Sequence, residues 1–302
     1  MTTVTTAPPA TRTGGEAPAP APRRRRGSWL TPLVIHTLLI AGAAAMIYPL
    51  LWMIASSFRE PHEVFTESGL IPSGFRFENY VDGWTGLTYD FSRFYLNSFL
   101  ISTLAVIGNL TACSMAAYGF ARIRFRFRGF WFAIMLLTLM LPIHVLILPQ
   151  YVIFQRIGWV DTFLPLTVPH FLAIDAFFIF LMVQFIRGIP TELDDAARID
   201  GCGHIQIYLR IILPLMKPAL ITTAIFTFIW SWDNFFAQVI FINSPRNFTV
   251  PLALRSFLDQ QADSAWPLLF AMATLALVPI FTIFLVLQRY LTTGIATTGL
   301  KG

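Results

Sequence analysis

The sequence predicts an all-α, polytopic membrane protein. Three observations support this: an apolar composition, long runs without charge, and arginines gathered between those runs. Of the 302 residues, 56% are hydrophobic and 12% are charged, whereas a soluble domain carries about 25% charged residues. Most of the surface must therefore face lipid, which argues against an ordinary soluble enzyme. The two cysteines, Cys113 and Cys202, give neither a disulfide framework nor a metal-ligand spacing.

The N-terminal segment, residues 1–28, is rich in Thr, Ala and Pro and ends in four arginines, Arg23 to Arg26. Such a segment cannot bury enough apolar surface to offset its ordering entropy, so we expect a disordered, basic tail. An arginine run before an apolar stretch can also open a signal peptide. The apolar stretch here continues to Ile54, however, which is longer than an h-region of about 7–15 residues. We therefore interpret it as an uncleaved first membrane anchor.

Charge-poor runs mark the membrane spans, because a helix needs about 20 predominantly apolar residues to cross about 30 Å of hydrocarbon. Six segments meet this requirement: 30–58, 94–121, 130–155, 162–186, 218–245 and 264–288. Only two contain an acidic residue, Asp175 in the fourth and Asp233 in the fifth. The sequence therefore predicts six transmembrane helices in a domain of residues 29–290, followed by a C-terminal tail, residues 291–302.

The placement of Lys and Arg predicts the orientation. With the N-terminus in the cytoplasm, fifteen of these residues lie on the inner side and six on the outer side. Cytoplasmic loops normally carry this excess, so both termini are predicted to be cytoplasmic. The run from Arg122 to Arg128 alternates arginine with Ile and Phe and could imitate a nucleic-acid patch. Its place between two spans favours a topogenic loop that contacts anionic lipid headgroups instead.

The predicted cytoplasmic loop between the fourth and fifth spans contains a short amphipathic helix. Thr191 is a good N-cap, and Asp194, three residues later, completes a pattern resembling a capping box. Gly201 allows a sharp turn, and a second amphipathic stretch, residues 204–213, is expected to stop at Pro214. Two such helices form either a knob for a partner's groove or a hairpin lying against its own bundle.

This loop resembles the signature loop of permease subunits of bacterial ATP-binding-cassette importers. That family's pattern is Glu-Ala-Ala, three residues, Gly, nine residues and then Ile-x-Leu-Pro. The chain has Asp195-Ala196-Ala197, then Gly201, then Ile211-Ile212-Leu213-Pro214, with both spacings intact and Asp in place of Glu. The resemblance implies the importer permease (type I) fold with a cytoplasmic coupling helix. It also implies the following ATPase-coupling residues: Glu192, Asp195, Ala196, Ala197, Asp200, Gly201, Ile211, Leu213 and Pro214.

The chain looks closest to the carbohydrate-uptake branch of that family, and specifically to its maltose-permease-like second subunit. Phe77-Glu78-Asn79-Tyr80 resembles the branch's Asn-Tyr motif, and Trp232-Asp233-Asn234-Phe235 resembles its Trp-Asn-acid-Phe motif with acid and amide exchanged. The resemblance implies import of a sugar or oligosaccharide across the bacterial cell membrane by alternating access. The implied partners are an ATPase dimer that uses ATP and Mg, a second six-helix permease and an extracytoplasmic sugar-binding protein.

The fifth predicted span offers a polar face for a substrate. Its polar and aromatic residues repeat at intervals of three and four, which places them on one stripe of a helix: Thr223, Thr227, Trp230, Asn234 and Gln238. Indole rings can stack on a sugar, and amides and carboxylates can bind its hydroxyls. Interhelical hydrogen bonding is the alternative. The candidate pathway residues are Trp230, Trp232, Asp233, Asn234, Gln238 and Asp175.

Known catalytic and phosphate-binding motifs do not occur in the sequence. A Gly-x-x-x-x-Gly-Lys-Ser/Thr loop is missing, as are His-Glu-x-x-His, Gly-x-Ser-x-Gly and paired-cysteine motifs. We therefore expect no catalytic residue, no metal site and no cofactor on this chain. The alternatives are a proton-coupled secondary transporter that uses Asp175 and Asp233 and an intramembrane enzyme that pairs these two acids.

Overall fold

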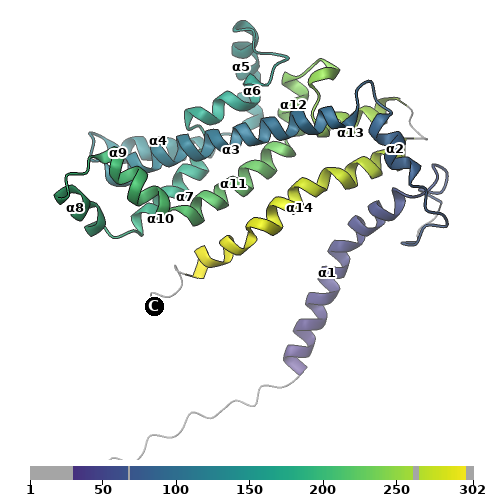
Figure 1. The fold of residues 1–302 in the computed structure, drawn as a ribbon, viewed down its shortest axis with the longest axis horizontal. Helices are drawn as coiled ribbons and strands as arrows, with labels where there is room; N and C mark the ends of the chain where they lie inside the picture. Colours follow the sequence, from purple (N-terminus) through teal and green to yellow (C-terminus); the bar gives the residue numbers. More distant parts are fainter. Residues whose placement is uncertain (1–29, 67–68, 261–264, 297–302) are drawn as a thin grey trace, which may run out of the picture. The chain divides into compact units, whose positions relative to one another are not determined.

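The computed structural model describes residues 30–66, 69–260 and 265–296, and the regular secondary structure in these ranges is entirely helical (Figure 1). The chain divides into two units, residues 1–49 and 50–302. In the first unit, the described residues form the beginning of α1 (Leu30–Ser56), a helix without charged residues. The predicted disordered tail, residues 1–28, lies outside the described residues, and so does the end of the predicted C-terminal tail, residues 297–302.

Four helical segments in the described ranges are long and apolar enough to cross a membrane. They are Pro32–Ser56 in α1, Phe91–Arg122 as α3, Leu164–Arg187, and Trp266–Arg289 within α14 (Trp266–Ala296). A fifth span results if the helical pair His204–Leu215 and Lys217–Trp232, bent by 75°, is counted as one. The all-helical membrane fold is confirmed, but the predicted count of six spans is not.

The third predicted span, residues 130–155, is two shorter helices rather than one. These are α4 (Arg128–Thr138), of 11 residues, and α5 (Ile143–Arg156), of 14 residues. Pro142 precedes α5 in an extended conformation, with φ −64° and ψ 126°. A proline lacks a backbone N–H and disfavours helix in the residue before it. Neither helix alone reaches the length that a span needs.

Two more predicted spans are interrupted. The fourth contains α6 (Leu164–Thr167), the 3₁₀ helix η1 (Val168–Leu172) and α7 (Ala176–Arg187), with Ala173 left-handed at φ 54°. The fifth contains α11 (Lys217–Trp232) and α12 (Phe235–Phe241). Inside a membrane, an interrupted helix is tolerated where protein or a polar cavity satisfies the freed backbone groups.

Within the second unit, α3 is the central helix. It packs along α11, α7 and η1, while α14 packs against α11, α13 (Val250–Gln260) and α2 (Glu78–Thr85). In Figure 1, α8 (Glu192–Ile199) lies near one end of α3, and α2 and α13 lie near the other. The helix α8 therefore lies at the opposite end of α3 from α2 and α13.

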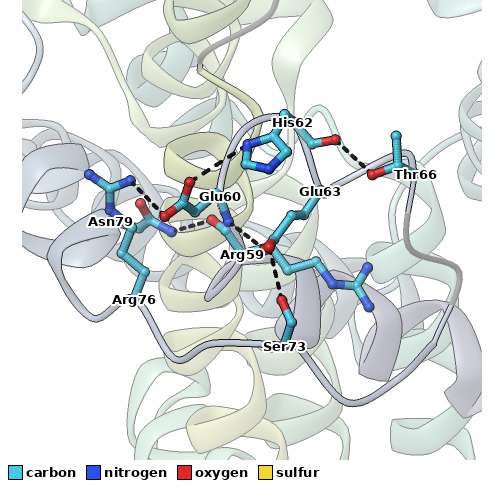
Figure 2. A network of polar contacts seen from close by, with 8 residues as sticks. All are labelled: Arg59, Glu60, His62, Glu63, Thr66, Ser73, Arg76 and Asn79. Atoms are coloured by element: carbon cyan, nitrogen blue, oxygen red, sulfur yellow. Dashed lines mark hydrogen bonds and ion pairs between the residues drawn. The ribbon is translucent and has the colours of Figure 1, made fainter.

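The loop after α1 is held by hydrogen bonds from the Asn79 side chain to backbone carbonyl groups. Asn79 donates through Nδ2 to the carbonyl oxygen of Arg59 at 2.9 Å (Figure 2), and also to that of Ser57 at 2.9 Å. The hydroxyls of Ser57 and Tyr80 are hydrogen-bonded at 2.8 Å, and the Arg59 guanidinium donates to the carbonyl of Gly69. The Asn79-Tyr80 pair of the sequence motif therefore closes this loop.

Two further contacts fix the middle of the same loop. Ser73 donates to Oε1 of Glu63 at 2.9 Å (Figure 2), and this hydrogen bond lowers the pKa of the Glu63 carboxyl. The backbone N–H of Arg76 donates to the carbonyl of Phe58 at 2.9 Å. In the described part of the loop, these polar contacts lie beside an aromatic cluster in which Phe58 packs against Phe75 and Phe77.

Asp161 joins the turn after α5 to the turn after α12. Its Oδ1 accepts the backbone N–H groups of Asn243 at 3.0 Å and Ser244 at 2.8 Å, and its own N–H donates to the carbonyl of Phe241 at 2.7 Å. Burial raises the pKa of the Asp161 carboxyl, but the hydrogen bonds from Ser244 and Asn243 outweigh it, so the pKa is lowered. The ionised carboxylate therefore clamps the two turns together.

We predict that Gly108→Ala, but not Gly119→Ala, destabilises the protein, although both glycines lie in α3. A Cβ atom at residue 108 would lie 2.8 Å from Cδ2 of Phe171 and 3.0 Å from the carbonyl carbon of His170, so η1 must move. Overpacking of this kind costs about 1–3 kcal/mol. At Gly119 a Cβ meets nothing within 4 Å, and alanine is the better helix former.

The measurement is the thermal unfolding midpoint of the purified protein in detergent. We expect a clear decrease for Gly108→Ala and no decrease for Gly119→Ala. Equal midpoints for the two variants would show that η1 does not depend on close contact with α3.

Candidate functional site

The segment that carries the sequence signature, residues 191–216, begins with α8 and a well-defined helix end. The N–H of Cys202 donates to the carbonyl of Ala197 at 2.9 Å, and the N–H of Gly201 donates to that of Arg198 at 3.0 Å. Gly201 is left-handed, with φ 81°. These are the two hydrogen bonds of a Schellman motif, which favours glycine at the left-handed position. Gly201 is therefore required for its backbone conformation.

The start of α8 is held by a buried ion pair instead of a capping box. Thr191 makes no side-chain cap, and the predicted role of Asp194 in capping is wrong. The Asp194 carboxylate lies 3.0 Å from Nε of Arg122, with only 4% and 6% of the two side chains exposed. Arg122 also donates to the carbonyl of Ile189 at 2.6 Å. Because the Asp194 carboxylate is paired with Arg122, it does not accept a hydrogen bond from the backbone at the start of its own helix.

The second half of the segment is continuous helix through Leu215, so the predicted stop at Pro214 is wrong. It consists of α9 (His204–Ile207), the π-helical turn η2 (Tyr208–Ile212) and α10 (Leu213–Leu215). Pro214 lies near the C-terminal end of this helix, directly after the π-helical turn, and its missing N–H leaves a carbonyl of the preceding turn without its helical partner. The chain bends by 75° only after Leu215.

Hydrogen bonds join this second half to α3. The hydroxyls of Ser114 and Tyr208 are 2.7 Å apart, and Tyr118 Oη lies 3.3 Å from Nδ1 of His204. Together with Arg122, these contacts fix both halves of the 191–216 segment to one end of α3. A force on the segment therefore acts directly on the central helix.

The outward face of the segment is exposed and partly apolar. Glu192, Asp195, Ala196, Asp200, Gly201 and Pro214 are exposed, whereas Ala197 is buried and Ile211 and Leu213 are half-buried. Ile199 is 87% exposed and Ile205 is 75% exposed. Large exposed apolar side chains next to charged ones are typical of a protein contact surface. One face of the 191–216 segment thus packs against the other helices of this chain, and the opposite face is exposed.

A second candidate site is a polar cavity of about 150 Å³. It is lined by the interrupted helices, and its polar residues are Gln150, His170, Asp175, Ser231, Asn234 and Gln238. Nδ1 of His170 and Oδ2 of Asp175 are 3.0 Å apart. Three of the predicted pathway residues, Asp175, Asn234 and Gln238, share this cavity.

The other three predicted pathway residues lie elsewhere. Trp230 is 53% exposed and packs against Phe178. Trp232 is buried in an aromatic cluster with Phe228. Asp233 lines a separate, mainly apolar pocket of about 170 Å³. Asp175 and Asp233 therefore line different pockets, an arrangement that does not suit the carboxylate pair of the intramembrane-enzyme alternative.

The predicted polar stripe along the fifth span is not continuous, because α11 ends at Trp232. Asn234 caps the next helix, where its Oδ1 accepts the N–H of Ala237 at 3.2 Å. Thr227 accepts a hydrogen bond from Asn109 at 3.0 Å. The break turns Asn234 and Gln238 toward the cavity, while Thr227 joins two helices, as the interhelical alternative proposed.

Sequence reasoning missed Gln150 and Ser231 in the cavity and the Arg122–Asp194 pair. An amide next to Pro149, inside an otherwise apolar run, was a usable signal for Gln150. The ion pair had no such signal, because its members are far apart in the chain. Among the described residues, no group of three His, Cys, Asp or Glu side chains is placed to hold a metal ion.

The model of the family "Binding-protein-dependent transport system inner membrane component" matches residues 108–297. The arabinooligosaccharides transport system permease protein of Halalkalibacterium halodurans is 34% identical, over 91% of this chain and 97% of its own. The trehalose/maltose transport system permease protein of Thermococcus litoralis is 30% identical, over 88% and 96%. In fold, the chain is similar to a bacterial ABC transporter involved in the import of the acidic polysaccharide alginate. That likeness has a TM-score of 0.76 and 22% identity, and covers 89% of this chain and 99% of the other.

We predict that Arg122→Ala destabilises the protein much more than Arg198→Ala does. Removing Arg122 leaves the buried Asp194 carboxylate without its cation, which costs about 3–5 kcal/mol. Arg198 pairs with Asp195 at 2.9 Å, but the two side chains are 47% and 66% exposed. An exposed pair of this kind contributes about 0–1 kcal/mol.

Thermal unfolding of both purified variants measures the difference. A double variant, Arg122→Leu with Asp194→Leu, is expected to recover most of the loss, because both buried charges are then gone. Similar midpoints for the two single variants would contradict a special role for the buried pair.

Proposed function

Because this chain belongs to the family of binding-protein-dependent transport system inner membrane components, we propose that it moves a sugar or oligosaccharide into the cell. It does so as the permease subunit of an ATP-binding-cassette importer, by alternating access. The observation that carries the proposal is the 191–216 segment. Its signature spacing is intact, its inner face is pinned to α3 by the Arg122–Asp194 pair, and its outer face is open to a partner.

ATP hydrolysis is assigned to separate subunits in this proposal. The exposed face around Asp195 and Gly201 would seat against an ATPase, and closure of an ATPase dimer would push on the segment. The push reaches α3 through Arg122 and through the Tyr208 and His204 contacts. Since ATP would bind the closed dimer more tightly than the open one, it shifts the equilibrium between the two states of the permease.

A carbohydrate substrate is supported by two relatives whose names specify arabinooligosaccharides and trehalose/maltose transport. The polar cavity also suits it. Gln150 and Asn234 offer amide donors, and Asp175 offers a carboxylate acceptor, all against apolar walls. Few converging polar groups in an apolar pocket are the usual means of orienting a small polar ligand. We therefore place the pathway beside this cavity, with Trp230, at an exposed position on α11, as a stacking surface for the sugar.

The assembly follows from the family. The chain is a multi-pass membrane protein, and permeases of ABC importers work with ATPases and a binding protein. We propose that it pairs with a different six-helix permease and receives its sugar from an extracytoplasmic binding protein. In this proposal it lies in the bacterial cell membrane, with both termini and the 191–216 segment in the cytoplasm.

The experiment is uptake of a labelled oligosaccharide by vesicles that contain the complete transporter. Uptake should require ATP and survive an ionophore that collapses the proton gradient. ATP-independent uptake driven by that gradient would overturn the proposal in favour of the secondary transporter.

The same assay tests the coupling segment. Gly201→Val places a branched residue at a left-handed position, which costs about 1–3 kcal/mol, and we expect at least tenfold slower uptake in a complex that still inserts. Gly201→Asn is the control, because asparagine tolerates the left-handed conformation, and it should retain most of the uptake. Equal uptake by the valine variant and the wild type would contradict the role of this turn.

We predict that Gln150→Leu raises the sugar concentration needed for half-maximal uptake by about 5–150-fold, the effect of losing one or two hydrogen bonds of about 1–1.5 kcal/mol each. Gln184→Leu is the matched control, since this amide is exposed on α7 and lies outside the cavity. An unchanged half-maximal concentration for Gln150→Leu would remove this cavity from the pathway while leaving the ATP dependence intact.

A further inference from the structure

The turn between α3 and α4 has an unusual conformation that exposes its aromatic side chains. Phe127 is left-handed, with φ 61°, although it is not glycine. A bulky residue in this conformation is strained, and such strain is retained where function or packing requires it. Phe125 is 41% exposed and Phe127 is 62% exposed. The Arg126 guanidinium lies 4.9 Å from the centre of the Phe127 ring, and most of the Phe127 side chain is nevertheless exposed.

A cleft of about 660 Å³ lies between this turn and α8. Its charged residues are Arg122, Arg124, Arg128, Asp194, Asp195 and Arg198, and His204 also lines it. The two carboxylates already pair with Arg122 and Arg198. Among the described residues, no carboxylate pairs with Arg124 or Arg128, and Arg128 makes only a 3.4 Å hydrogen bond to the carbonyl of Ile123. The cleft therefore has two guanidinium groups without a counter-charge.

The same turn begins an apolar helix whose surface is open. No residue of α4 is buried, and Phe130 and Trp131 in its first turn are 60% and 52% exposed. Aromatic rings beside arginines at the start of an apolar helix are typical of the membrane interface, where rings lie at headgroup depth. Arg128, the first residue of α4, lines the cleft, so the cleft lies next to the start of this apolar helix.

We propose that this cleft is a binding site for an anionic phospholipid whose phosphate lies between Arg124 and Arg128. Guanidinium groups bind phosphate oxygens through paired, charge-assisted hydrogen bonds. The rings of Phe127, Phe130 and Trp131 contact the glycerol and upper acyl region. Because Arg122 and Asp194 line the same cleft, the bound lipid lies next to the ion pair that holds α8.

A lipid fits the observations better than the other anions that this cleft could attract. An acidic loop of a partner protein, or a free phosphate ion, would interact with the arginines alone. Neither would account for exposed aromatic rings beside them. Exposed rings occur both in the turn, at Phe127, and in the first turn of the apolar helix α4, at Phe130 and Trp131. This arrangement matches a molecule with one charged end and one apolar end.

The test uses the complete transporter reconstituted in phosphatidylcholine vesicles that contain a spin-labelled phosphatidylglycerol. Electron paramagnetic resonance measures the motionally restricted fraction of this lipid, relative to spin-labelled phosphatidylcholine. The wild type should prefer the anionic lipid. A basic residue near the surface contributes a factor of about five, so Arg124→Gln and Arg128→Gln should each reduce the preference severalfold, and the double variant should reduce it further.

Arg156→Gln is the matched control, since it removes an exposed arginine at the end of α5 and should leave the preference unchanged. Arg124→Lys and Arg128→Lys retain charge and folding and should keep part of the preference. Inorganic phosphate in the buffer should not displace the lipid. The proposal is overturned if the glutamine variants keep the wild-type preference, if phosphate displaces the lipid, or if these variants lose the ATPase subunits while their lipid preference is unchanged.

Discussion

The buried ion pair between Arg122 and Asp194 is the interaction on which the arrangement of the functional segment depends. It fastens the first turn of α8 to the last residue of α3, and the same arginine holds the carbonyl of Ile189 just before that helix. Two isolated charges cannot be buried without a large desolvation cost, so each fixes the position of the other. The pair thus sets where the exposed face of residues 191–216 stands relative to the central helix.

The interrupted helices supply the polar residues of the cavity proposed to lie beside the substrate pathway. A straight apolar helix has no free backbone groups and offers a substrate nothing polar. The breaks at Ala173 and Asn234 place His170, Asp175 and Gln238 around a small cavity inside an apolar bundle. Gly108 permits this arrangement, because η1 approaches α3 more closely than any side chain at that position allows. The central helix α3 therefore contacts the polar cavity, and Ile101 of α3 lines it. A motion of α3 would change the shape of the cavity.

Charge at the α3–α4 turn adds a third element beside these two. Arg122 belongs to the mechanical connection, while Arg124 and Arg128 line the same cleft and have no carboxylate partner in the described part of the chain. One short basic turn thus joins the membrane interface to the segment proposed to meet the ATPase. Any anion that settles in the cleft alters the electrostatic field around the Arg122–Asp194 pair, whose separation is 3.0 Å.

The sequence by itself determined the helical class, the three uninterrupted spans in α1, α3 and α14, and the signature loop, because apolar run length and local motif spacing are properties of neighbouring residues. It did not determine that residues 130–155 divide at Pro142, since a proline is compatible with either a kink or a break. Nor did it show that Asp194 pairs with Arg122 instead of capping its helix, or that Gln150 joins Asp175 and Asn234 while Asp233 lines another pocket. Only the tertiary structure decided these points, because each depends on which distant helices pack together and which polar groups their packing leaves to be satisfied.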